Sequence, residues 1–198
     1  MFAFLAGIAA GLLHVFSGPD HLAAVAPLAS DRGRGHWLTG LQWGLGHTLG
    51  VVLIATLLLL FKERLPLDAI SAHSERMVGV SLILLGSWGL HRAWRLSSSG
   101  AGVHSHAGTS FSMGTIHGLA GSSHLLGVLP ALAFPSRPSA ILYLAGFGLG
   151  AIAGMTAFST AVGMLSSKLK RHSRSHSGFL YASSAVALVV GGVWLVGR

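Results

Sequence analysis

The sequence lacks cysteine altogether and is poor in charged residues, and each shortage excludes a class of function. Without cysteine the chain forms no disulfide, no thiolate metal site and no thiol redox centre, so it is not a membrane carrier of thiol–disulfide exchange. Charged residues make up 9% of the 198 residues, against about 25% in a typical soluble domain. So few charges cannot cover a water-facing surface, which indicates a protein that faces lipid.

Hydrophobic residues, by contrast, make up 52% of the chain, and 28 residues are glycine. Small residues let membrane helices approach closely, so this abundance of glycine is typical of helices packed in a bilayer. The formal net charge of +8 does not indicate nucleic-acid binding, because nearly all lysines and arginines lie in short segments between apolar runs. In such segments they act as orientation signals.

Six apolar segments are long enough to cross about 30 Å of hydrocarbon at about 1.5 Å per residue. They lie near residues 2–29, 39–61, 77–95, 111–133, 139–165 and 178–197. The first has no positively charged start of the kind found in secretory signals, so we expect a retained helix. The sequence therefore predicts an all-α membrane protein with six transmembrane helices.

The two halves of the chain resemble each other. GLLHVFSGPDHLAAVAPL in the first half aligns with GTIHGLAGSSHLLGVLPA in the second. The matched pieces are 11–28 with 114–131, 44–46 with 148–150, and Trp88 with Trp194. Three matches in the same order indicate a duplication with three spans in each half. Because three is an odd number, the second half must enter the membrane from the opposite side, as in inverted-repeat transporters.

This repeat divides the chain into two three-helix units, each beginning with a broken helix. We expect the first unit at residues 1–96 and the second at residues 111–198. Residues 97–110 would form a cytoplasmic linker containing His104 and His106. These histidines, with His172 and His176 in another predicted cytoplasmic loop, either collect metal or are ordinary solvated loop residues.

The distribution of lysine and arginine favours one orientation in the membrane. Eight fall on one predicted side, namely Arg32, Arg34, Arg92, Arg95, Lys168, Lys170, Arg171 and Arg174. Five fall on the other, namely Lys62, Arg64, Arg76, Arg137 and Arg198. Positive residues concentrate on the cytoplasmic side, so both termini should lie outside the cytoplasm of a bacterial inner membrane or its equivalent.

Ionisable residues inside the predicted spans are costly and therefore mark a candidate site. Those away from the ends of the spans are His14, Asp20, His21, His47, His117 and His124. Imidazoles with a single carboxylate suit a borderline divalent cation such as Ni, Co, Zn or Mn. Each histidine could instead hydrogen-bond a neighbouring helix. His124 could be present only as the repeated copy of His21, without a role in binding.

The spacing of the first group requires a break in the helix. In a straight helix His14 and His21 would be separated by about 10.5 Å of rise, too far to share one ion. Gly18 and Pro19 lie between them, and proline removes a backbone hydrogen bond and kinks or ends a helix. We expect this break to bring His21 and Asp20 toward His14.

At these residues the chain resembles the nickel/cobalt transporter superfamily, and more closely its short urease-accessory-type membrane branch. The resemblance is carried by HVFSGPDHLAAVAPL at 14–28, GLGHTLGVV at 44–52 and HGLAGSSHLLGVLP at 117–130. It implies a nickel or cobalt permease with His14, Asp20, His21 and His47 at the signature positions. The longer members carry H-x4-D-H and eight spans, whereas this chain has H-x5-D-H and six predicted spans, which leaves the metal and the direction of transport open.

The sequence thus predicts a permease that binds a divalent metal ion and no prosthetic group, with the bilayer as its surroundings. A homo-oligomer or a metallochaperone partner is compatible with this prediction. Two alternatives stay open: a transporter of another divalent cation such as Mn or Zn, and a metal-delivery or sensing partner of a metalloenzyme such as urease. We do not expect an enzyme, because metal-assisted hydrolysis needs a further acid or base besides the ligands, and Asp20 is the one carboxylate within the spans.

Overall fold

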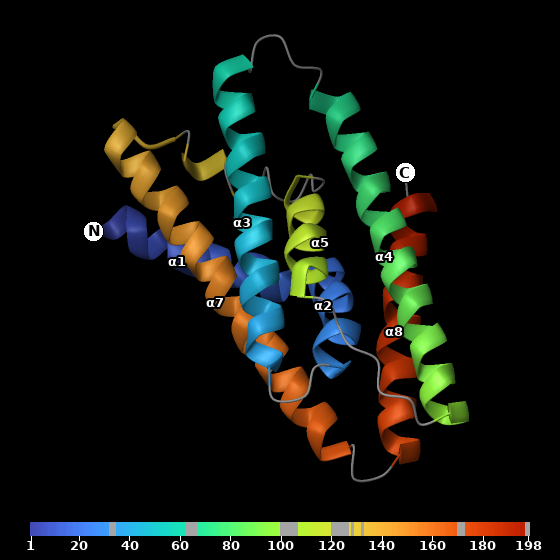
Figure 1. The fold of residues 1–198 in the computed structure, drawn as a ribbon. Coiled ribbons are helices and arrows are strands. Elements are labelled where there is room, and N and C mark those ends of the chain that lie inside the picture. Colours follow the sequence, from blue (N-terminus) through green and yellow to red (C-terminus); the bar gives the residue numbers. More distant parts are fainter. Residues whose placement is uncertain are drawn as a thin grey trace.

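The computed structural model describes residues 1–31, 35–61, 67–99, 107–119, 127, 129–131, 133–169 and 173–196. Within these ranges the chain is helical and contains no strand, as predicted (Figure 1). The helices are α1 (Phe2–Ser17), α2 (Pro19–Asp31), α3 (His36–Phe61), α4 (Leu67–Ser99), α5 (Ala107–Leu119), α7 (Arg137–Leu169) and α8 (Ser173–Val196).

Length and apolar composition qualify three helices of the described chain as membrane spans, namely α3, α7 and α8. The bent pair of α1 and α2 qualifies as a fourth if it is counted as one span. Helix α4 is long, but it carries acidic and basic residues along its length. Helix α5 has 13 residues, fewer than the roughly 20 that a span needs. The six-span count therefore stays a prediction.

The predicted break between His14 and Asp20 is confirmed. Helix α1 ends at Ser17, and the extended backbone of Gly18 turns the chain while its N–H donates to the His14 carbonyl at 3.1 Å. Pro19 then opens α2, a position where the missing N–H costs nothing and the fixed φ suits a helix. The axes of the two helices differ by 74°.

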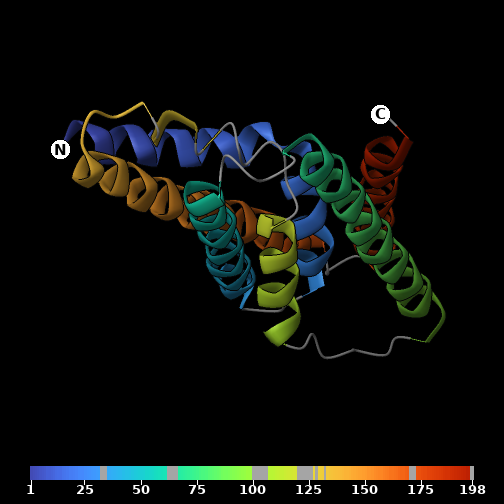
Figure 2. The same cartoon turned by 90° about the horizontal axis from the view of Figure 1, so that it is seen from above.

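The helices pack as three close pairs, α1 with α7, α3 with α5, and α4 with α8 (Figures 1 and 2). In the first two pairs, glycine allows backbone to touch backbone. A Cβ at Gly11 would overlap the carbonyl of Phe147, and one at Gly114 would overlap the carbonyl of Trp43. Each of these contacts joins one predicted half of the chain to the other.

The glycine contacts also give the direction of each pair. Gly7 lies against Tyr143 and Gly11 against Phe147, so α1 and α7 run parallel. In the same way, Gly114 lies against Trp43 and Gly118 against His47, so α3 and α5 run parallel. Helices α4 and α8 are antiparallel, because Gly79 meets Gly191 whereas Gly86 meets Ser184.

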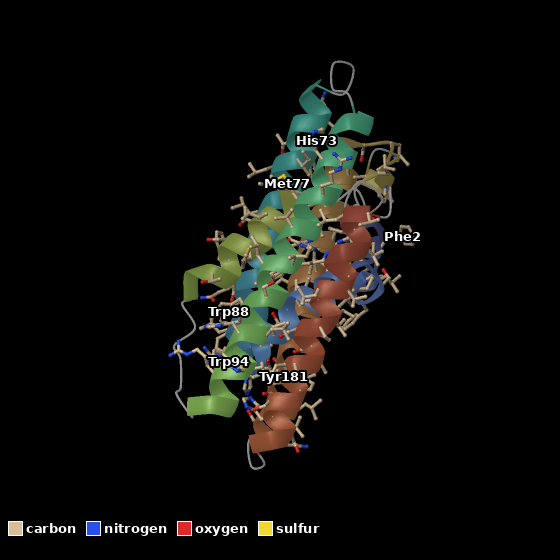
Figure 3. All side chains as sticks on the ribbon, turned by 90° about the vertical axis from the view of Figure 1, so that its right-hand side faces the viewer. Phe2, His73, Met77, Trp88, Trp94 and Tyr181 are labelled. Carbon is tan, nitrogen blue, oxygen red and sulfur yellow. The ribbon has the colours of Figure 1, made fainter. Side chains whose placement is uncertain are left out.

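The α4–α8 pair stands at one side of the molecule and presents large side chains outward (Figure 3). Met77, Trp88 and Trp94 of α4 and Tyr181 of α8 are exposed. In a bilayer such apolar surface needs no protein partner, because lipid covers it. The α4–α8 pair reaches the rest of the protein mainly through α2.

One histidine lies elsewhere than the sequence indicated. His176, predicted in a cytoplasmic loop, is buried near the start of α8. Arg92, counted with the charges of the predicted cytoplasmic side, is buried too, and its guanidinium lies 5.7 Å from the centre of the Trp88 ring. Helix α4 continues to Ser99 and α5 begins at Ala107, so both extend into the predicted linker. His104, His106 and His172 are outside the described residues.

The α1–α7 contact can be tested by adding a methyl group. Gly11→Ala places a Cβ against the Phe147 carbonyl and 2.8 Å from the Ala151 nitrogen, so the helices must separate. We expect a loss of about 1–3 kcal/mol, the usual cost of overpacking, seen as a lower Tm in detergent. Gly192→Ala is the matched control, because nothing lies within 4 Å of its added Cβ. An equal Tm for the two variants would contradict the close packing of α1 on α7.

Candidate metal centre

The bend at Gly18 builds the first part of the site by folding α2 back on the end of α1. His14 lies in the last turn of α1, and His21 lies in the first turn of α2. Their ring centroids are 4.6 Å apart, with the rings edge to face. A straight helix would separate the two residues by about 10.5 Å of rise. The bend removes most of that separation, so both imidazoles can reach one ion.

Helix α3 adds a third imidazole. The Nε2 atoms of His21 and His47 are 3.1 Å apart, and both side chains are fully buried. Nitrogens that share an ion at about 2.0–2.1 Å are separated by roughly 2.8–3.4 Å for angles between octahedral and tetrahedral. His14 completes a group whose ligand atoms all lie within 4.8 Å of one another. This spacing suits three ligands of a single cation.

Asp20 forms a second group with His21 and His117. Its Oδ1 lies 3.1 Å from His21 Nδ1, and its Oδ2 lies 3.1 Å from His117 Nε2. A carboxylate on one ring nitrogen of a histidine fixes the tautomer and aims the other nitrogen at a metal. Asp20 holds His21 in this way, with Nε2 turned toward His47. The two groups share His21, so they form one centre.

Four of the five side chains of the centre are buried, His14 is partly exposed, and Asp20 is the single carboxylate among them. Asp20 is 2% exposed, and His117 is fully buried beside it. A buried carboxylate is stable only when it is paired or well hydrogen-bonded, and here each oxygen of Asp20 has an imidazole partner. The arrangement offers a cation neutral nitrogen donors and one compensating negative charge.

The sequence prediction can now be compared with the structure residue by residue. His14, Asp20, His21, His47 and His117 converge from α1, α2, α3 and α5. His124 lies outside the described residues, as does the Gly121-Ser122-Ser123 segment predicted to break the second half. That the five converging residues bind a metal ion stays a prediction.

Two aromatic neighbours of the site were missed. The Phe147 ring of α7 lies 5.4 Å from the His14 ring, and the Trp43 ring of α3 lies 5.8 Å from the His117 ring, measured between centroids. The repeat alignment contained the signal, because each aromatic residue directly precedes an aligned Gly-Leu-Gly. An aromatic residue in a glycine-rich apolar run is ordinarily a packing residue, so the pattern alone does not assign either residue to the site.

Comparison with known proteins finds three similar chains. Chloroplast protein FOR GROWTH AND FERTILITY 1 of Arabidopsis thaliana is 42% identical over 88 residues, 44% of this chain and 24% of that protein. Chloroplast protein FOR GROWTH AND FERTILITY 2 of the same plant is 34% identical over 200 residues, 93% of this chain and 54% of that protein. Urease accessory protein UreH of Bacillus sp. (strain TB-90) is 27% identical over 200 residues, 93% of this chain and 86% of that protein.

The chain thus spans about half or less of the two chloroplast relatives. No protein-family model and no solved structure matches it. The similarity to a urease accessory protein agrees with the urease-accessory-type resemblance read from the motifs. It is a distant similarity, and the nickel/cobalt superfamily as a whole stays an expectation.

Gly18 offers a test of the site that replaces none of the candidate ligands. A Cβ at Gly18 would overlap His21 Nδ1 and lie 2.9 Å from Asp20 Oδ1. Gly18→Ala should therefore displace both side chains and weaken Co²⁺ binding by about 10–100-fold, as removal of an orienting partner does. The absorption spectrum of bound Co²⁺ in detergent measures this effect. Gly35→Ala, with open space around its Cβ, is the control, and equal affinities would remove Gly18 from the site.

Proposed function

We propose that this protein is a membrane permease for a divalent transition-metal cation, with nickel or cobalt as the favoured cargo. The observation that carries this proposal is the meeting of the buried His21 and His47 with the partly exposed His14 within ligand distance of one another. Neutral imidazoles are the ligands that such borderline cations prefer. A largely buried histidine cluster inside apolar helices is costly unless it serves a ligand or a transport path.

In the proposed complex the cation is held by His14 and by the Nε2 atoms of His21 and His47. Asp20 orients His21 and supplies the negative charge, and His117 braces the other carboxylate oxygen. The ligands must be deprotonated to bind, so cation and protons compete for the site. Three neutral nitrogen donors, with water or one further ligand, bind a cation without enclosing it fully. A carrier needs such an incomplete site, because it must release its cargo.

We further propose that residues 1–96 and 111–198 are two inverted repeats that rock against each other. The support comes from the helix pairs. The first helix of each proposed half packs parallel to the second helix of the other half, α1 with α7 and α5 with α3. The third helices, α4 and α8, are antiparallel. This set of directions is the one that opposite insertion of two equivalent halves produces.

One hydrogen bond of Asp20 crosses the boundary between the proposed halves, because Asp20 lies in the first half and its partner His117 in the second. A cargo site at such a boundary can be exposed to alternate sides as the halves move. We place the protein in a bacterial inner membrane or an equivalent membrane, with both termini outside the cytoplasm. The chloroplast relatives favour including organelle membranes among the equivalents.

The name of the bacterial relative supports a second candidate function. UreH is a urease accessory protein, and delivery or sensing of metal for a metalloenzyme would use the same His/Asp site. This candidate predicts metal binding without flux across the membrane. We do not propose an enzyme, because both oxygens of Asp20 are engaged by histidines and a hydrolytic metal site needs an additional general base.

Flux measurements test the permease directly. In proteoliposomes containing a Ni²⁺- or Co²⁺-sensitive dye, we expect the wild-type protein to carry cation down its gradient. His21→Ala and His47→Ala each remove one nitrogen of the pair 3.1 Å apart. Each variant should lower flux and Co²⁺ affinity by about tenfold or more, since loss even of an orienting partner costs that much.

The control for this experiment is His91→Ala, because His91 is an exposed histidine of α4 beside Trp94. It should carry cation at the wild-type rate. Unchanged flux in the His21 and His47 variants would place the transport path elsewhere. Binding by the wild-type protein without any flux would favour the delivery or sensing role.

A further inference from the structure

Phe147 and Trp43 occupy matching places in the two proposed halves. Both rings are buried, at 2% and 1% exposure. Phe147 lies against His14, and Trp43 lies against His117, which is the aligned partner of His14 in the repeat. The backbone of each also meets an aligned glycine, since Phe147 touches Gly11 and Trp43 touches Gly114. Each half thus presents one aromatic ring to the first histidine of the other half.

The two rings lie at different depths along the centre of the molecule. Helices α3 and α7 are antiparallel, because Gly44 lies against Ile152 and Thr48 against Gly148. In this register Phe147 of α7 is level with the residue that follows Thr48 on α3. That level is about six residues from Trp43, or about 9 Å along the axis of α3. His47 lies between these two depths. One aromatic ring is therefore located on either side of the histidine cluster.

A cavity adjoins one of these rings. It lies between α3 and α7, has a volume of about 50 Å³, and is lined by Thr48, Val51, Ala55, Leu144, Phe147 and Gly148 among others. Its lining is mainly apolar, so it is a space into which a neighbouring side chain can move rather than a water site. Phe147 lines the cavity and also contacts His14, whereas His14 itself does not line it. The Phe147 ring is thus the partition between the cavity and the histidines.

We propose that Phe147 and Trp43 are the two gates of the cation path, one on each side of the metal centre. The proposal rests on the permease function proposed above. The apolar cavity beside Phe147 gives that ring the space to swing aside and open the way to His14. A close-packed apolar constriction excludes ions by excluding their water, and the burial of both rings means that both gates are closed in this structure.

Removing the gates singly and together tests this arrangement. Phe147→Ala and Trp43→Ala each open one side, and the remaining ring should still block free passage. The double variant should leak, with passive Co²⁺ flux into dye-loaded proteoliposomes on the order of tenfold above either single variant. Such a rise is non-additive, as expected for two barriers in series on one path.

Matched controls use aromatic residues of the same two helices that do not contact the histidines. The double variant of Phe158→Ala and Trp37→Ala should show wild-type flux, because Trp37 is exposed and Phe158 only flanks the main apolar cluster. The conservative variants Phe147→Tyr and Trp43→Phe should keep the gates closed. Retention of the wild-type Co²⁺ spectrum confirms that each variant is folded around an intact site.

The natural absence of cysteine permits an independent readout without transport. Ala151 is fully buried, and in the α3–α7 register it is level with the residue after Gly44, between the depths of Trp43 and Phe147, so Ala151→Cys places a thiol between the gates. A membrane-impermeant cationic methanethiosulfonate should not modify it while both gates are present. With Phe147→Ala the thiol should react from one face of the membrane, tested in spheroplasts and inverted vesicles, and with Trp43→Ala from the opposite face.

The outcomes separate this inference from the function on which it rests. A double variant no leakier than the single ones, or an Ala151→Cys thiol that stays unreactive in both gate variants, would overturn the gates even if wild-type transport is normal. Co²⁺ binding without wild-type flux would instead overturn the permease, and the thiol reactivity would still decide whether the rings close the site.

Discussion

The carboxylate of Asp20 is the point on which the rest of the centre depends. It is the one acidic side chain among the converging site residues, and its two oxygens hold His21 of its own helix and His117 of a distant one. A buried carboxylate needs such partners, and neutral imidazoles inside a membrane protein need an anchor that orients them. One side chain meets both needs and ties α2 to α5.

Asp20 reaches that position because the chain breaks at Gly18. The glycine leaves room for the side chains of His21 and Asp20, and Pro19 starts the next helix at the position where proline is tolerated best. The 74° bend brings together residues that a straight helix would hold a full two turns apart. Binding chemistry and backbone geometry are therefore encoded in the same short segment.

Close packing of glycine supplies the second constraint. Because Gly11 and Gly114 carry no side chain, α1 meets α7 and α5 meets α3 backbone to backbone, and van der Waals contact of this kind is the main source of helix association in lipid. The same contacts bring Phe147 and Trp43 against His14 and His117. The residues that pack the helices together are therefore also the candidate gates, so a movement of the proposed halves would change access to the site.

The sequence alone predicted the helical class, the break at Gly18 and five of the residues that converge, because these follow from local rules. Apolar length, the backbone restriction of Gly-Pro and the cost of ionisable groups in lipid can all be read from neighbouring letters. The internal alignment also pairs Trp43 with Phe147, although nothing in the alignment distinguishes a gate from a packing residue.

Only the tertiary structure decided which atoms meet. The contacts of His21, with His47 through Nε2 and with Asp20 through Nδ1, depend on how the helices meet. The same is true of the burial of Arg92 and His176. It is also true of the place of Phe147 between a cavity and His14. A helical pattern specifies which face of a segment is apolar. It does not specify the partner, depth or rotation of that face, because those are set by how helices remote in sequence fit against one another.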